Sequence, residues 1–319
     1  TWNSSRLPAH LKPYHYKIDL RINVYQKMFN GNTSIRFLCL RTIPFIVIHA
    51  DTNLLFSRMN QYPRIYEIRS EDDQSVRIKR SLDIKRMTYN SFFSYYIFDL
   101  DRNETFRRNK RYMISFEDFS SPITNNLKGI YYSSYNRKNQ NKAIVVSQLQ
   151  PLEARKVFPS FDEPNMKAKF SISIEHHKEF TALSNMEEIK ITPLDSKWSR
   201  TDFDITPLMS TYILAFVVCD FKPIVKYGPN NLKIRVWTRD EYQNHTKYAL
   251  DIIPKAYSFF ERYFDIKEVV KKSDHFAAPD FNAGAMENWG LVIYRESSLL
   301  FDPEKSTLED EYFVLLVIC

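Results

Sequence analysis

A ten-residue stretch near the end of the chain has the composition of a ligand-binding turn. Residues 281–290 read FNAGAMENWG and hold two of the five glycines of the chain together with one carboxylate, Glu287. Gly284 and Ala285 would let the backbone of a ligand approach closely and would offer it main-chain N–H and C=O groups. Glu287 could then pair with a cation. A well-packed turn before a strand at 291–294 is the alternative interpretation of the same residues.

Other chemistry-bearing residues do not complete a site within the chain. Cys39, Cys219 and Cys319 provide neither a C-x-x-C pair nor a disulfide framework. The H-E-x-x-H, Walker, G-x-S-x-G and G-x-G-x-x-G patterns are absent from the sequence. The spacing of the histidines therefore matches no metal-binding motif. They are His10, His15, His49, His176, His177, His245 and His275.

Composition and charge describe a folded protein rather than a nucleic-acid binder. The 319 residues are 44% hydrophobic and 15% aromatic, which excludes a disordered chain and suggests about two domains. No apolar run reaches the roughly 18 residues of a membrane-spanning helix. The 45 basic residues exceed the 38 acidic ones, but the two kinds alternate, as between Arg64 and Arg86. A mixed-sign surface of this kind leads us to expect no nucleic-acid partner.

Hydrophobic alternation predicts strands over the first two-thirds of the chain. In residues 16–24 every second residue is apolar and those between are polar, as in a half-buried strand. Similar patterns recur at 35–39, 45–50, 75–79, 95–100, 112–116, 169–175 and 212–219. Strands at this density without a long helix predict an all-β sandwich or saddle.

After Asp220 the apolar spacing becomes helical, from about 241 to 264. Pro254 falls inside that pattern, so we expect a kink or a break there. The sequence thus predicts a mainly β, sandwich-like saddle domain at 1–219, followed by the beginning of an α+β domain at 220–319.

Both ends of the chain lead us to expect a fragment. It begins with Thr1 and no signal-peptide pattern. Residues 306–309 predict a capping box that opens a helix, which would be cut at Cys319 after about three turns. Residues 312–319 are almost wholly apolar and include no polar residue that would cap the helix. Four N-x-S/T sequons allow a secretory location, at Asn3, Asn32, Asn103 and Asn244.

Two motifs resemble those of a known enzyme family. Residues 284–288 spell G-A-M-E-N, the exopeptidase signature of zinc metalloaminopeptidases of the aminopeptidase N family. Residues 147–164, SQLQPLEARKVFPSFDEP, are similar to a second motif of that family, although Ser160 stands where many members have Cys. Weaker similarities lie at 11–16 and 129–135. The resemblance covers essentially the whole chain in family order.

The resemblance implies a β-saddle that closes one side of an active site, followed by a thermolysin-like catalytic domain. It implies that Glu287 binds the free α-amino group of a peptide, and that Gly284 and Ala285 hold its backbone. Met286 and Asn288 complete this substrate-binding loop. The saddle would add Gln148 and Gln150 to the first subsite.

Gln150 would be the partner of the amine by the same resemblance. Many members carry Glu at this position, so the chain has one anionic anchor fewer. That difference implies a preference for neutral over acidic residues at the substrate N-terminus.

The family resemblance also implies Zn²⁺ in the complete enzyme. The H-E-x-x-H motif of the family follows the signature and would lie beyond Cys319, so we expect this fragment to bind no zinc, to hold no catalytic residue and to be inactive alone. Peptides with a free N-terminus would be its partners, and a homodimer of the full-length form stays open. A plasma-membrane ectoenzyme or a secreted protein is expected, with a cytoplasmic form as the alternative.

A second hypothesis takes the chain as a non-catalytic peptide-binding module or a truncated decoy isoform. The reading frame beyond Cys319 separates the two: an H-E-x-x-H motif would support the enzyme, and a stop codon the module. A structural or adhesion ectodomain is a third interpretation, for which the sequence holds no positive signal.

Overall fold

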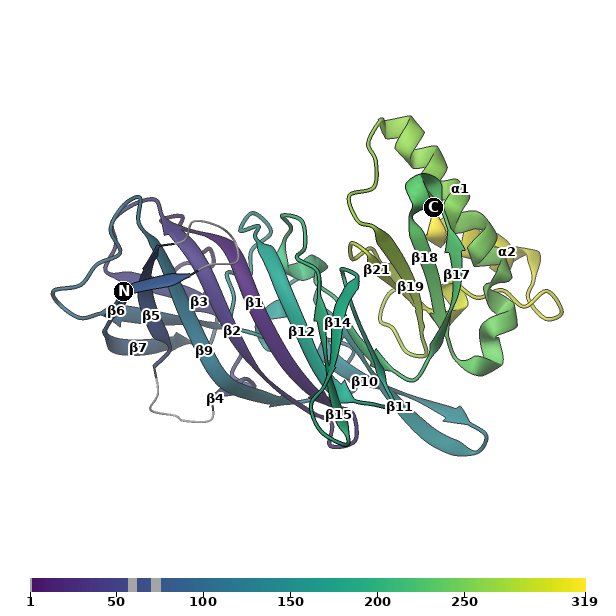
Figure 1. The fold of residues 1–319 in the computed structure, drawn as a ribbon, viewed down its shortest axis with the longest axis horizontal. Coiled ribbons are helices and arrows are strands. Elements are labelled where there is room, and N and C mark those ends of the chain that lie inside the picture. The colour runs from purple at the N-terminus through teal and green to yellow at the C-terminus, as the bar shows by residue number, and fades with distance from the viewer. Residues whose placement is uncertain (1, 57–61, 70–75) are drawn as a thin grey trace. The chain divides into compact units, whose positions relative to one another are not determined.

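The computed structural model describes residues 2–56, 62–69 and 76–319, and most of its regular structure is β-strand (Figure 1). The expected mainly β fold, followed by the beginning of a mixed domain, is confirmed. The chain divides into two compact units. Unit 1 comprises Thr1–Ile123, Leu149–Glu175 and Ile205–Tyr212, and unit 2 comprises Thr124–Gln148, His176–Asp204 and Ile213–Cys319. The domain boundary at 219/220 stays a prediction.

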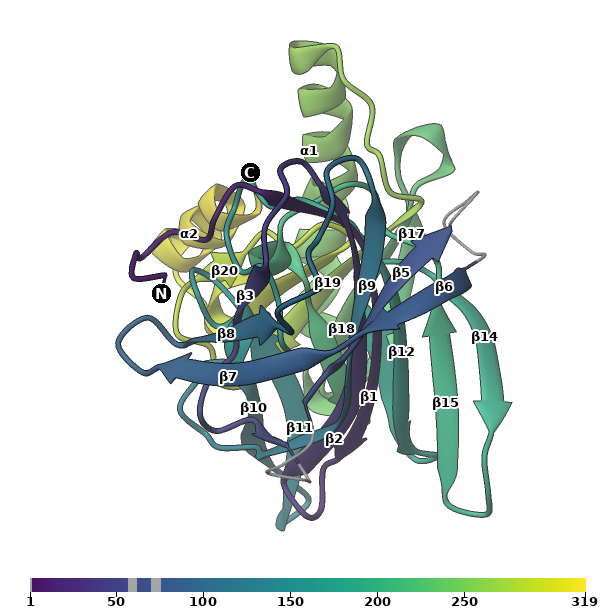
Figure 2. The same cartoon turned by 90° about the vertical axis from the view of Figure 1, so that its left-hand side faces the viewer.

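Unit 1 is built on a large twisted sheet with the strand order β12-β1-β2-β9-β5-β6, with β4 pairing to β9 (Figure 2). Only the β1–β12 pair is parallel among these neighbours. Their bounds are β1 Leu11–Asn23, β2 Met28–Cys39, β4 Leu55–Phe56, β5 Arg64–Arg69, β6 Arg77–Leu82, β9 Arg111–Pro122 and β12 Lys169–His177. A smaller sheet has the order β3-β8-β7, with bounds Phe45–His49, Tyr95–Leu100 and Ile84–Asn90.

The alternation read in the sequence explains the core of unit 1. Tyr16, Ile18, Leu20 and Ile22 of β1 are at most 1% exposed, while polar residues between them face the other side. Aromatic rings fill this interior; for example, Tyr16 stacks on Phe170 with ring centroids 4.8 Å apart. The strand expected at 75–79 corresponds to β6, and residue 75 lies outside the described part of the chain.

Unit 2 contains a four-stranded sheet and a five-stranded sheet. The first has the order β10-β11-β16-β13, with bounds Gly129–Arg137, Gln140–Gln148, Phe216–Cys219 and Thr181–Ser184. The hairpin of β14 (Glu188–Pro193) and β15 (Trp198–Phe203) also belongs to this unit. The second sheet has the order β17-β18-β19-β21-β20, with bounds Lys222–Tyr227, Lys233–Thr238, Lys272–Ala278, Leu291–Arg295 and Ala285–Met286.

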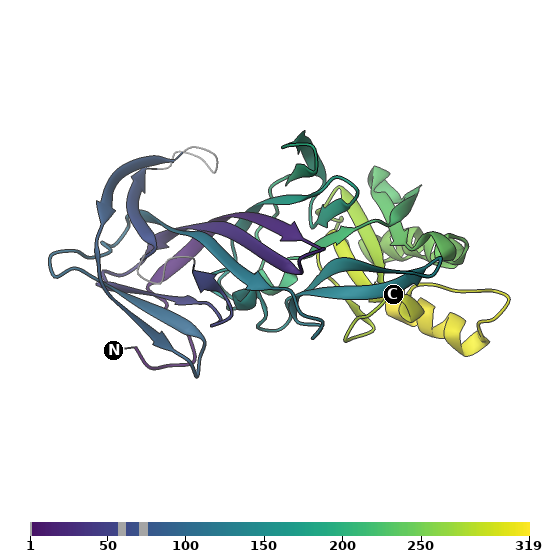
Figure 3. The same cartoon turned by 90° about the horizontal axis from the view of Figure 1, so that it is seen from below.

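Two helices accompany the second sheet. Helix α1 (Lys247–Phe264) connects the parallel strands β18 and β19 and buries Ala249 and Ile253 against Val236. Helix α2 (Leu308–Ile318) packs beside it (Figure 3). Short 3₁₀ turns complete the chain, at Ala154–Lys156, Thr211–Ile213, Pro229–Asn231, Asp240–Thr246 and Glu296–Ser298.

Two local expectations differ from the structure. Of the kink or break expected at Pro254, a break does not occur, because α1 runs through this residue from Lys247 to Phe264 and is held by its buried apolar face; a kink there stays a prediction. The capping box lies one residue later than expected: Thr307 accepts a hydrogen bond from the Asp310 N–H, and the Asp310 carboxylate accepts one from the Thr307 N–H. Within the described residues, no helix has the length and apolarity needed to cross a membrane.

Candidate functional site

The loop 284–288 lies at one edge of the five-stranded sheet of unit 2. Ala285 and Met286 form β20, which pairs antiparallel with Tyr294 and Ile293 of β21. Since β20 comes last in the strand order, its outer edge has no partner strand within the described chain. An extended peptide can add to such an edge through main-chain hydrogen bonds.

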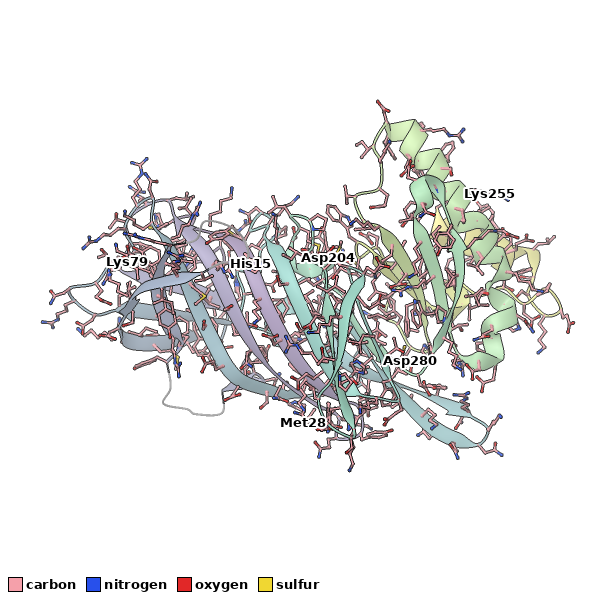
Figure 4. All side chains as sticks on the ribbon, viewed as in Figure 1. His15, Met28, Lys79, Asp204, Lys255 and Asp280 are labelled. Carbon is pink, nitrogen blue, oxygen red and sulfur yellow. The ribbon has the colours of Figure 1, made fainter. Side chains whose placement is uncertain are left out.

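Hydrogen bonds fix the point where this loop begins. The Arg295 N–H donates to the Gly284 carbonyl at 2.9 Å. The Arg295 guanidinium donates to the Phe281 carbonyl from both Nε (3.2 Å) and Nη2 (2.8 Å). The Tyr131 hydroxyl donates to the carbonyl of Asp280 at 2.9 Å, and Figure 4 labels Asp280 near strand β10. The backbone before residue 284 is thus held by neutral and charged donors.

Gln148 is the last residue of strand β11. Its side chain lies on the face of the β10–β11 hairpin that binds Asp280. It pairs with Gly129 across the β10–β11 ladder, so both residues project from the same face. Tyr131 and Ser133 follow Gly129 at two-residue steps, and both bind Asp280. The Gln148 side chain therefore emerges on the face that anchors the start of the loop.

Two buried side-chain amide oxygens have no hydrogen-bond partner among the described residues. The Gln148 Oε1 atom belongs to a side chain in a residue that is 7% exposed, and the Asn288 Oδ1 atom to one that is 2% exposed. The other end of the Asn288 amide donates to the Met286 carbonyl at 3.4 Å. Leaving a buried acceptor unpaired costs about 1–3 kcal/mol, so both oxygens are suited to a donor supplied from outside the chain.

Glu287 is an exposed carboxylate. Its side chain forms no hydrogen bond or ion pair with another described residue. It lines a cavity of about 660 Å³ together with Ala285, Trp289 and Tyr294, whose other walls come from α1, the loop 266–269, β19, β21 and the end of α2. An external cation can therefore reach it without displacing an internal partner.

Met286 and Gln150 differ from the other site residues that the sequence predicts. Met286 is only 1% exposed, so its side chain packs in the interior and only its main chain is suited to contact a ligand. Gln150 is exposed and belongs to unit 1, whereas Gln148 and the loop 284–288 belong to unit 2. The role of Gln150 stays a prediction.

A buried ion network beside the loop was missed by sequence reasoning. The Lys272 ammonium donates to the Asp274 carboxylate at 2.7 Å and to the Gly290 carbonyl at 2.7 Å. Arg235 and the Trp237 indole N–H also bind Asp274. Burial alone would raise the pKa of Asp274, but Lys272 and Arg235 hold it below its ordinary value. All seven residues of β19 are buried, which alternating Lys and Asp in its sequence does not suggest.

His275 forms a second buried polar group on the same strand. Its Nε2 contacts the Ser273 hydroxyl and its Nδ1 the Tyr294 hydroxyl, each at 3.0 Å. The Ser273 hydroxyl is also 2.8 Å from that of Tyr257. Burial lowers the pKa of His275 to about 4, so the ring is neutral at pH 7.

The described residues do not fit a zinc site. Nowhere in 2–56, 62–69 or 76–319 do three His, Cys, Asp or Glu side chains gather closely enough to hold one ion. His275 is enclosed by hydroxyl groups, and His49 is a core residue whose pKa burial lowers to about 3. No catalytic step is therefore assigned to a metal held by these residues.

Comparisons with protein families place the chain in a class of peptidases. The Peptidase M1 N-terminal domain matches residues 12–213, and the Peptidase family M1 domain matches residues 248–319. The chain belongs to the peptidase M1 family. The resemblance drawn from the two sequence motifs is thereby confirmed.

Similar proteins of this family are aminopeptidases. The chain is 37% identical to aminopeptidase N of Homo sapiens and 36% identical to aminopeptidase N of Bos taurus, in each case over 99% of this chain and 33% of the relative. It is 31% identical to glutamyl aminopeptidase of Homo sapiens, over 99% of this chain and 32% of the relative. The chain thus spans about a third of the length of these curated relatives.

Proposed function

We propose that this chain provides the amine-binding loop and part of the first subsite of an aminopeptidase that removes N-terminal residues from peptides. One observation carries the proposal: Glu287 directly follows the edge strand β20, is exposed and has no partner among the described residues. The aminopeptidase relatives support it.

The charge of Glu287 suits the recognition of a peptide N-terminus. A peptide α-amine has a pKa of about 8 and is mostly cationic at neutral pH, whereas an internal peptide segment offers only neutral amides. A carboxylate at a fixed place on the edge therefore distinguishes a chain end from a chain interior. Because the amine is held at one point, cleavage at a constant distance from it releases one residue at a time.

The rest of the loop suits the substrate backbone. A Cβ atom on Gly284 would lie 3.5 Å from the Ser298 hydroxyl, which is ordinary van der Waals contact, so packing within the chain does not require glycine here. The small residue instead keeps the edge open to a ligand. The unpaired oxygens of Gln148 and Asn288 add acceptors for the amine and the N–H groups of a substrate.

Zinc belongs to the proposal as the cofactor of the complete enzyme. When bound, it would polarise the scissile carbonyl and activate water. We place its ligands and the general base in polypeptide outside these 319 residues, since the residues described here do not fit a site. In the same proposal Gln150 favours neutral N-terminal residues, and the enzyme acts at the plasma membrane or in a secreted form.

A pair of substrates tests the proposed function in the full-length protein. L-leucine 4-nitroanilide carries the free amine, and in N-acetyl-L-leucine 4-nitroanilide a neutral amide with an added acetyl group replaces it. We expect hydrolysis of the first, loss of activity with a zinc chelator, and no measurable hydrolysis of the second. Equal hydrolysis of both would contradict the proposal.

The same protein separates the enzyme from a binding module. A module or decoy would bind the free-amine compound without hydrolysing it, and its reading frame would stop without an H-E-x-x-H motif. Hydrolysis that zinc restores after chelation excludes that alternative.

A further inference from the structure

The segment 184–188 runs from the last residue of strand β13 to the first residue of β14 and contacts the sheet that carries the loop. It forms four polar contacts with residues of β18, β19 and the end of the loop. These join the Ser184 carbonyl to Lys272 Nζ (2.6 Å), Asn185 Nδ2 to the Trp289 carbonyl (2.9 Å), Glu187 to Lys233 (3.3 Å) and Glu188 to Arg235 (3.0 Å). The Trp289 contact lies directly after the loop 284–288, and Lys272 in turn donates to the Gly290 carbonyl.

Lys272 is placed to hold the backbone rather than to meet solvent. It is 1% exposed, and its ammonium donates to the carbonyls of Ser184 and Gly290 and to the carboxylate of Asp274. An ammonium has three N–H donors, so all of them are used. The Gly290 carbonyl also accepts from the Asp274 N–H at 2.9 Å, which gives this oxygen two donors.

Asn185 holds the neighbouring residue in the same way. It is fully buried, and its Nδ2 donates to the carbonyls of Ile213 and Trp289, each at 2.9 Å. Its Oδ1 accepts from the Ala215 N–H at 3.0 Å. Its own carbonyl lies against Gly290, where a Cβ atom would be 2.0 Å away. Both carbonyls that follow the loop are therefore fixed by buried donors.

We propose that Lys272, Asp274 and Asn185 form a buried clamp that positions Glu287 for the substrate amine. The inference rests on the proposed function and deepens it. Arg295 holds the loop at Phe281 and Gly284, and the clamp holds it at Trp289 and Gly290. Between these two ends β20 pairs with β21 and Met286 packs inside, while the exposed Glu287 side chain has no partner among the described residues. The place of Glu287 on the edge is thus determined by this pairing and by the two fixed ends.

The chemistry of the clamp explains why a charged residue is buried here. The Ser184 and Gly290 carbonyls converge on one point, and a single ammonium supplies donors to both, which no apolar side chain can do. The Asp274 carboxylate balances the positive charge of Lys272, and Asp274 and Glu188 together balance that of Arg235. Removing the ammonium frees the loop end, and a displacement of about 1 Å is enough to lower catalytic efficiency up to about a hundredfold.

The test compares two hydroxamate inhibitors of the full-length protein. L-leucine hydroxamate carries the α-amine, and 4-methylpentanohydroxamic acid lacks only that group, so the ratio of their inhibition constants measures amine recognition. We expect Lys272→Met to reduce this ratio about tenfold. Lys233→Met is the matched control, because Lys233 contacts the same segment through Glu187 and does not touch the loop; its ratio should equal that of the wild type.

A second variant separates positioning from stability. Lys272→Met/Asp274→Asn removes one charge of each sign and leaves Arg235 paired with Glu188, so its ratio should be as low as that of Lys272→Met without a lone carboxylate beside Arg235. The ratio is read from this variant and from Asn185→Ala if Lys272→Met does not fold. A wild-type ratio in any of the folded clamp variants, or a loss of affinity equal for both inhibitors, overturns the clamp. A wild-type protein that does not prefer the amine contradicts the proposed function instead.

Discussion

Gly284 and Gly290 lie six residues apart in one loop, but the fold requires glycine at only one of the two positions. Gly290 has φ of +74°, and a Cβ atom on it would lie 2.0 Å from the Asn185 carbonyl. The fold therefore requires glycine there. A Cβ atom on Gly284 would make only ordinary contacts. Packing within the chain accounts for glycine at position 290, whereas at position 284 space for a ligand would account for it.

The charged residues of the two regions differ in the same way. Asp274 is buried and contacts Lys272, Arg235 and Trp237. Glu287 is exposed and has no partner in the described parts of the chain. Polar groups with partners inside the chain hold the end of the loop, and groups without partners among the described residues lie at its tip, which we propose as the binding region. The predictions below test this division, beginning with the largest effect.

Asp274→Asn should be the most damaging single change, since it leaves Lys272 and Arg235 buried without their carboxylate. We expect the unfolding free energy of this region to fall by about 3–5 kcal/mol. Hydrogen exchange of residues 270–292 in the full-length protein measures the loss. The control Asp251→Asn alters an exposed ion pair with Lys226 and should leave exchange unchanged. Equal exchange in Asp274→Asn and the wild type would show that the network is not structural.

His275 should make this buried region sensitive to acid. Its pKa is about 4 in the folded chain against an ordinary value of 6.5, so the unfolded state takes up the proton first as the pH falls. Stability is then complete above pH 6.5 and decreases down to about pH 4, by about 3 kcal/mol. Asp274 and Lys272 are the charged groups that act on the ring.

The variant His275→Gln isolates that effect. It keeps a hydrogen-bonding side chain beside Ser273 and Tyr294 but does not titrate. The thermal midpoint of the wild type minus that of the variant should decrease as the pH falls from 7 to 4. A difference that is constant over this range would contradict the assignment, whereas other titrating groups such as His49 affect both proteins equally.

The two glycines provide the direct comparison. Gly290→Ala should destabilise the region by at least about 2 kcal/mol, because an L-residue at this φ is strained and its Cβ atom meets backbone. Gly284→Ala should keep the wild-type thermal midpoint and lower kcat/KM for L-leucine 4-nitroanilide. Thermal denaturation and kinetics of both variants test the pair. If Gly284→Ala destabilises as much as Gly290→Ala, the division between tip and clamp fails.

The sequence predicted the elements better than the contacts between them. Alternation in residues 16–24 identified β1 because one face of that strand is buried and the other is wet. Resemblance identified residues 284–288, since the order of five residue types is visible in a sequence. The buried network of Lys272 and Asp274 was not predicted, because charged residues ordinarily indicate an exposed strand. Only the tertiary contacts show that β19 is buried.

The sequence also could not predict which side chains of the loop are exposed and which are buried. Glu287 is exposed and the side chain of the neighbouring Met286 is buried, which the order of residue types does not show; the substrate-binding role of Met286 stays a prediction. On a strand such as β20, adjacent residues take opposite faces, so the direction of each depends on the register with β21. The motif alone does not specify that register.

The central claim is that the Glu287 carboxylate binds the substrate amine, and Glu287→Gln in the full-length protein tests it most directly. This change keeps the size of the side chain and removes its charge. We expect kcat/KM for L-leucine 4-nitroanilide to fall at least about tenfold, with the thermal midpoint unchanged because the side chain has no internal partner. A variant that retains the kcat/KM of the wild type would contradict the claim.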